Sequence, residues 1–209
     1  EVAGATAGLG SVVLAFNLGT SDQADLVAAT TAGPTQGLST LATKVPALAT
    51  SDKMSAMLDK ITAAPAAQLA KAGFSASQVP TLLGSMAFGA SSNLGSLTQV
   101  SGLTAGNTSA LISKISQSAN SAAAAVNVPN FTANATTMDS ISTAVSNKST
   151  SALSRIAAVN PQFTSNEAKD ALNGIASGAV AALGVLAQAG KIGSGDIGTL
   201  AGKATSSAI

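Results

Sequence analysis

The sequence contains no histidine, cysteine, tyrosine or tryptophan, and its five phenylalanines are its only aromatic residues. Without these side chains, most nucleophile–base pairs and nearly all transition-metal sites cannot be built. A serine–lysine pair remains available, but no serine stands three residues before a lysine, so the common Ser-x-x-Lys helical arrangement is missing. We therefore predict that the protein is not an enzyme and binds no cofactor.

Charged residues are also scarce, at 9% of the 209 residues, and the net charge is +1. Globular proteins carry roughly a quarter charged residues, so serine, threonine, asparagine and glutamine must cover this surface instead. Nucleic acids and anionic membranes attract basic surfaces, and single strands also need aromatic stacking platforms. The composition predicts no nucleic-acid partner, whereas the weak charge repulsion favours self-association into a homo-oligomer or filament.

Two pairs of acids lie three residues apart, Asp22 with Asp25 and Glu167 with Asp170. Each pair would share one face of a helix and could hold a hard cation. Acids are also favoured in the first turn of a helix, where they offset the positive end of its dipole. The second explanation is simpler, and we predict no metal site.

Two long apolar segments are candidates for membrane spans. Residues 1–18 are rich in glycine and too short to cross a bilayer, so we interpret them as a segment used in assembly. Residues 171–190 have about the right length, but Asn173 and Gln188 interrupt them, which favours a buried helix at the centre of a bundle over a span. Gly174 and Gly178 would let a neighbouring helix approach closely, either inside the bundle or as an assembly face between chains.

A short motif recurs about every 29 residues: a large apolar residue, two small residues, and then serine, asparagine or glycine. The apolar residues are Leu18, Leu48, Phe74, Leu103, Phe131, Phe163 and Ile192. The motif is typical of a helix start, with the fourth residue as the N-cap. These caps would be Ser21, Ser51, Ser77, Gly106, Asn134, Asn166 and Gly195, and an acid follows four of them.

The motif predicts seven helices and a quasi-repeat of about 29 residues. We expect the helices at residues 22–43, 52–72, 78–89, 107–127, 135–158, 167–189 and 196–207. Pro34 and Pro65 should end or kink the first two helices, because proline lacks the backbone donor. The competing interpretation is disorder, but regular caps and a positive mean hydropathy argue against it. The expected fold is all-α, a single domain over residues 1–209 forming a compact bundle of seven or eight helices.

Four N-x-Ser/Thr sequons begin at Asn107, Asn130, Asn134 and Asn147. In secreted proteins such sequons accept N-linked glycans. A chain rich in asparagine, serine and threonine also forms sequons by chance, so they favour an extracellular location only mildly.

Two of the helix starts read Phe74-Ser-Ala-Ser-Gln-Val-Pro-Thr-Leu82 and Ile192-Gly-Ser-Gly-Asp-Ile-Gly-Thr-Leu200. These segments, and the low-charge, cysteine-free composition rich in alanine, serine and glycine, resemble the repetitive domains of spider silk proteins of the aciniform and tubuliform types. The resemblance covers short motifs and composition. It implies a helical unit that is stored in soluble form and assembles into fibres.

Two functions from different classes remain open. The first is an extracellular structural protein whose subunits self-assemble into a filament or fibre. The second is a soluble helical bundle that encloses an apolar ligand, such as a lipid or sterol, between small side chains. A cell-surface adhesion protein is a third interpretation, which the sequence does not separate from the first.

Overall fold

The computed structural model describes residues 2–100 and 102–208, and the end residues of the predicted domain lie outside this part. All regular secondary structure in the described residues is helical, which confirms the predicted all-α bundle. The α-helices are α1 (Val2–Phe16), α2 (Thr20–Lys44), α3 (Ser51–Ala63), α4 (Val79–Ser92), α5 (Leu94–Leu97), α6 (Thr108–Ser121), α7 (Ala135–Val159), α8 (Ser165–Gln188) and α9 (Ser194–Ala208). Short 3₁₀ turns lie at Pro46–Leu48, Ala66–Gln68, Ala76–Gln78, Ala105–Asn107 and Ala122–Ala125.

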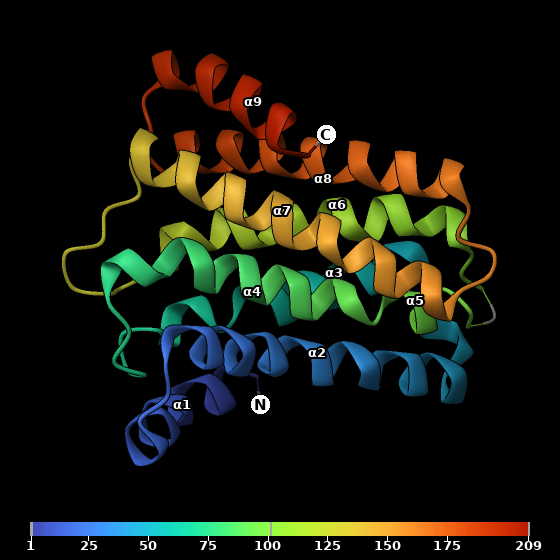
Figure 1. Cartoon of the computed structure of the whole chain (residues 1–209). Coiled ribbons are helices and arrows are strands. Elements are labelled where there is room, and N and C mark those ends of the chain that lie inside the picture. The colour runs from blue at the N-terminus through green and yellow to red at the C-terminus, as the bar shows by residue number, and fades with distance from the viewer. Residues whose placement is uncertain (1, 101, 209) are drawn as a thin grey trace.

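The long helices form two layers (Figure 1). The first layer consists of α2, α4, α7 and α9, and each of these helices packs on the next. The second layer lies behind it and consists of α3, α6 and α8, again packed in that order. The chain therefore alternates between layers, and each long helix contacts the second helix after it.

Neighbouring helices within a layer run parallel. In the first layer, Gln78 Nε2 at the start of α4 donates to Gln23 Oε1 near the start of α2 at 2.6 Å, and Asn93 Nδ2 at the end of α4 donates to the Ala32 carbonyl further along α2 at 2.8 Å. In the second layer, the Ser109 hydroxyl near the start of α6 donates to the Asp170 carbonyl near the start of α8 at 2.9 Å, and the Ser116 hydroxyl further along α6 donates to the Ile175 carbonyl of α8 at 2.8 Å. These bonds join residues 55 to 61 positions apart. The predicted quasi-repeat of about 29 residues stays a prediction, since the long helices vary between 13 and 25 residues and α5 has only four.

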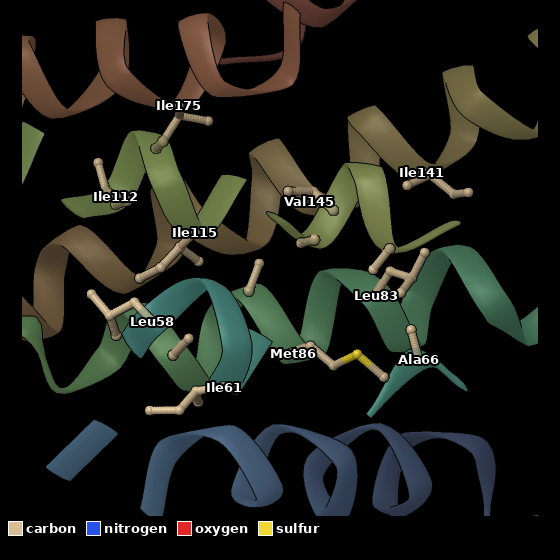
Figure 2. Close-up of a cluster of buried hydrophobic side chains, with 14 of the residues drawn as sticks. Leu58, Ile61, Ala66, Leu83, Met86, Ile112, Ile115, Ile141, Val145 and Ile175 are labelled. Carbon is tan, nitrogen blue, oxygen red and sulfur yellow. The ribbon is translucent and has the colours of Figure 1, made fainter. Parts of the chain in front are cut away.

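Aliphatic side chains fill the space between the layers. Figure 2 shows part of this core, in which Leu83 and Met86 of α4, Ile115 of α6 and Val145 of α7 are all fully buried. Burial of one such side chain contributes roughly 1.5–3 kcal/mol. Phe74 and Phe163 are the aromatic residues buried in this core.

Glycines bring helices of the same layer into close contact. A Cβ atom on Gly89 of α4 would lie 2.0 Å from the Ala28 carbonyl oxygen of α2, and one on Gly84 would lie 2.8 Å from the Ala144 carbonyl oxygen of α7. Gly178 of α8 has the same relation to Ser113 of α6, at 2.1 Å. Only a glycine fits at these points, because the neighbouring backbone occupies the space of a side chain.

The predicted helix starts are confirmed within a few residues, but most of the predicted caps are wrong. Only Asn134 caps its helix as expected, accepting a bond from the Thr137 amide at 3.0 Å. Elsewhere the cap comes before the predicted residue: Gly19 instead of Ser21, Thr50 instead of Ser51, Ser75 instead of Ser77, Thr104 instead of Gly106, and Thr164 instead of Asn166. At Ser75, Thr104 and Thr164, the side chain three residues later bonds back to the cap residue's amide, which forms a capping box.

The capping box at α8 makes stability depend on pH. The Thr164 hydroxyl and backbone amides donate to the Glu167 carboxylate and lower its pKa from the ordinary 4.5. A group with a lowered pKa in the folded state stabilises the fold above its unfolded pKa and loses that effect as pH falls through the folded value. We expect Glu167→Ala to destabilise the protein at pH 7 and to have less effect below pH 4, in urea unfolding at both pH values. An equal effect at both would contradict this.

The two prolines act differently. Helix α2 includes Pro34 and continues to Lys44, one residue past its predicted end, whereas α3 ends before Pro65 rather than at residue 72. Most of the N-terminal segment, which lies outside the seven predicted helices, forms the additional helix α1. One further expectation needs correction. Helix α8 does not lie at the centre of the bundle, because it is the last helix of the second layer and exposes Asn173, Ser177 and Gly184.

Candidate functional site

The charged side chains of the described residues are dispersed rather than gathered into a catalytic group. Lys114 pairs with Asp59 at 3.2 Å and Lys203 with Asp139 at 2.7 Å, and each pair joins two neighbouring helices of one layer. No group of three or more acidic side chains that could hold a metal ion occurs in residues 2–100 and 102–208. These ion pairs are exposed, and such pairs contribute at most about 1 kcal/mol each.

A surface hollow of about 440 Å³ lies between the starts of α2 and α4 and the middle of α7. Asp25 and Lys148 line it together with hydroxyl and amide groups, and Gln78 Nε2 donates to Gln23 Oε1 at 2.6 Å beside it. The Lys148 ammonium and the Arg155 guanidinium also lie over the Phe88 ring, at 5.7 and 4.7 Å from its centre. This arrangement positions two cations on an aromatic face but provides no activated nucleophile.

One end of the two-layer stack consists of α1 and α2 (Figure 1). Helix α1 carries no charged residue and packs on α2 and on the segment that follows α3. Its Leu14 and Phe16 side chains are 83% and 71% exposed, the highest values among the large exposed hydrophobic residues of the described chain. On α2, Gly33 and Gly37 are exposed and open to solvent.

The other end of the stack consists of α8 and α9 (Figure 1). The α9 residues that pack inwards include Leu200 and Ala204, and Lys203 reaches across to Asp139 of α7. The outer face of α9 carries only glycine and hydroxyl side chains, namely Gly195, Gly198, Thr199, Gly202, Thr205 and Ser206. We call this set the α9 outer face.

Gly174 and Gly178, the predicted packing pair, lie against α6 within the same chain. Ideal Cβ atoms on them would lie 2.5 Å from the Ser109 carbonyl oxygen and 2.1 Å from that of Ser113. The structure therefore places the pair in an intramolecular contact, so this face of α8 is not open to a second chain. The open glycine pairs at the two ends were missed, although their four-residue spacing is visible in the sequence.

The four sequon asparagines occupy different settings. Asn130, Asn134 and Asn147 are exposed, whereas Asn107 is half-buried and its Oδ1 accepts a bond from the Thr104 amide at 2.8 Å. Asn147 lies on α7, between the two ends of the stack. Their glycosylation stays a prediction.

Among the described residues, α8 is the one helix whose length and composition match a membrane span. About 44% of its most apolar window is buried inside the protein, and the core helix of a soluble protein passes the same test.

Comparison with known proteins adds no family assignment. No protein-family model, no curated protein and no solved structure matches this chain.

Proposed function

We propose that this protein is an extracellular structural subunit that self-associates into a filament or fibre. The exposure of Leu14 and Phe16 on an uncharged helix carries the proposal. Burying a leucine or phenylalanine side chain contributes roughly 1.5–3 kcal/mol, so these two residues favour association strongly. A second copy is the partner we favour, because the net charge of +1 leaves little repulsion between copies.

The ends of the stack support the same proposal. Proteins built from stacked helices remain soluble as single chains when their terminal helices have polar outer faces. Here the terminal helix α1 instead exposes the apolar side chains of Leu14 and Phe16. The resemblance to silk repetitive domains and the exposed sequons at Asn130, Asn134 and Asn147 agree with a fibre-forming subunit outside the cell.

The double variant Leu14→Lys/Phe16→Lys tests this proposal. We expect at least a tenfold weaker self-association in sedimentation velocity, because the two ammonium groups would have to lose water at the contact. Val159→Lys is the matched control, since Val159 is 48% exposed at the end of α7, away from both ends of the stack. A wild-type protein that stays monomeric at every concentration, salt and pH would overturn the proposal, and so would a double variant that associates as well as the control.

A second candidate function is the binding of an apolar molecule such as a lipid. A hollow of about 310 Å³ lined by Leu153, Ala157, Phe163 and Ala168 supports it. Its volume lies at the lower limit of small-molecule sites, which span about 300–1,000 Å³. Native mass spectrometry distinguishes the two functions, because a binding protein would be purified with a lipid attached and would form no filaments.

A further inference from the structure

Inside the chain, parallel helices of one layer meet through small residues. Gly89 faces α2 across a backbone contact, and Gly174 and Gly178, four residues apart, face α6 in the same way. Serine and threonine hydroxyls join these contacts, as the Ser116 hydroxyl does when it donates to the Ile175 carbonyl at 2.8 Å. Contacts between neighbouring helices of this protein therefore use glycine with serine or threonine.

The two helices at the ends of the first layer each carry a glycine pair of the same kind, and these pairs contact no other helix of the chain. On α2, Gly33 and Gly37 are four residues apart, and on α9 Gly198 and Gly202 are also four apart. An ideal Cβ on any of these four glycines would meet no atom within 4 Å. Glycine in the middle of a helix costs roughly 0.5–1 kcal/mol relative to alanine, and no contact within the chain offsets that cost here.

We propose that the α9 outer face of one copy docks on the Gly33–Gly37 face of α2 in a second copy, with the two helices parallel. This inference rests on the proposed self-association and names its contact surfaces. The docked helices continue the first layer from one copy into the next, in the same way that α4 continues α2 within the chain. The same arrangement brings α1 of the second copy to the side of α8, where its exposed Leu14 and Phe16 lose contact with water.

Charge is consistent with this pairing. The α9 outer face has no charged side chain, and the charges of α2 lie towards its two ends, at Asp22, Asp25 and Lys44. No charged side chain is buried at the centre of the contact, so the large desolvation penalty of a buried charge does not oppose it. Leu14 and Phe16 are a separate observation pointing to the same end of the stack, since their exposure does not depend on the glycine pattern.

The contact joins two different surfaces, so each copy keeps one free end of each kind. Such a head-to-tail contact produces a ring if its rotation closes and an open filament if it does not. A contact between two identical surfaces would stop at a dimer. This contact therefore produces rings or filaments, whereas self-association by itself would also allow a closed dimer.

Cysteine cross-linking tests the contact directly, because the natural chain contains no cysteine. The variants are Gly37→Cys and Gly202→Cys, at positions where a side chain meets no neighbour. With a bismaleimide, we expect a covalent dimer from an equimolar mixture of the two variants and none from either alone. The double variant Gly37→Cys/Gly202→Cys should give a ladder of covalent oligomers, and Gly37→Cys/Ala158→Cys, whose second cysteine lies on the exposed side of α7, should give none.

Different results would overturn the docking of α9 on α2 and the self-association on which that docking rests. Dimers from Gly202→Cys alone, or no cross-link in a mixture that sedimentation shows to be associated, would overturn the docking of α9 on α2 and leave self-association intact. Absence of association by sedimentation in the wild-type protein would overturn both. A charge on the contact gives a second readout, since Gly202→Lys should weaken association at least tenfold and Ala158→Lys should not.

Discussion

Replacing Gly178 with alanine lowers the free energy of unfolding by about 2–3 kcal/mol, the upper part of the range expected for an overpacked core. The new methyl group would lie 2.1 Å from the Ser113 carbonyl oxygen and 2.9 Å from the Gln117 amide nitrogen, and both are backbone atoms of α6. Helix α8 must then move away from α6, which weakens the bond from the Ser116 hydroxyl to the Ile175 carbonyl.

The matched control is Gly184→Ala on the same helix. Gly184 is exposed, and a Cβ atom there meets nothing within 4 Å. Alanine favours helix over glycine by roughly 0.5–1 kcal/mol, so this variant should be more stable than the wild type. Urea unfolding followed by circular dichroism measures both. Effects of the same sign at Gly178 and Gly184 would contradict the close contact between α6 and α8.

Replacing Ile115 with alanine should cost about 3–4 kcal/mol, within the range of buried isoleucine-to-alanine changes. Ile115 is fully buried on α6, a helix that contacts α3, α4, α7 and α8. Figure 2 shows it in the middle of the core cluster. The cost exceeds that of the lost burial alone, because the surrounding helices close only part of the cavity that the side chain leaves.

Two further substitutions calibrate this value in the same urea experiment. Ile115→Val removes one methylene group and should cost about 1 kcal/mol. Val185→Ala, at a side chain that is 42% exposed on α8, should change the unfolding free energy by less than about 0.5 kcal/mol. A loss below about 1 kcal/mol for Ile115→Ala would mean that α6 does not lie at the centre of the bundle.

Local sequence features predicted the helices well because each helix start carries its own signal. A large apolar residue followed by hydroxyl and small residues marks the start of most long helices, and proline ends α3 as expected. The cap residue itself was misplaced by two positions at Ser75, Thr104 and Thr164. Each is followed three residues later by Gln78, Asn107 or Glu167, whose side chain completes the box and begins the helix earlier.

The arrangement of the helices could not be predicted in the same way. Parallel neighbours in one layer are about 60 residues apart, and their contacts depend on which glycine meets which carbonyl group. Helical periodicity predicts which side of a helix faces the core, but it does not predict which other helix packs against that side. Helix α8 looked central because it is apolar on nearly every side, yet its exposed side carries mostly small or polar residues, with Val185 as the one large apolar side chain.

The candidate assembly surfaces were predictable only in part. The apolar, glycine-rich start indicated an assembly segment, and the structure shows Leu14 and Phe16 exposed there. Gly174 and Gly178 were the more obvious pair, but they pack against α6. The pairs Gly33–Gly37 and Gly198–Gly202 have the same spacing, and only the layer order shows that they lie at the ends of the stack.

Electron cryomicroscopy of the assembled wild-type protein tests the central claim, that copies stack end to end, most directly. We expect filaments in which the helices run across the long axis. The first layer places α2, α4, α7 and α9 in successive rows, and rows of packed helices lie ~8–10 Å apart, so the subunit repeat should be roughly 32–40 Å. Helices aligned along the filament axis, or only single 20.0 kDa particles at every concentration, would contradict the claim.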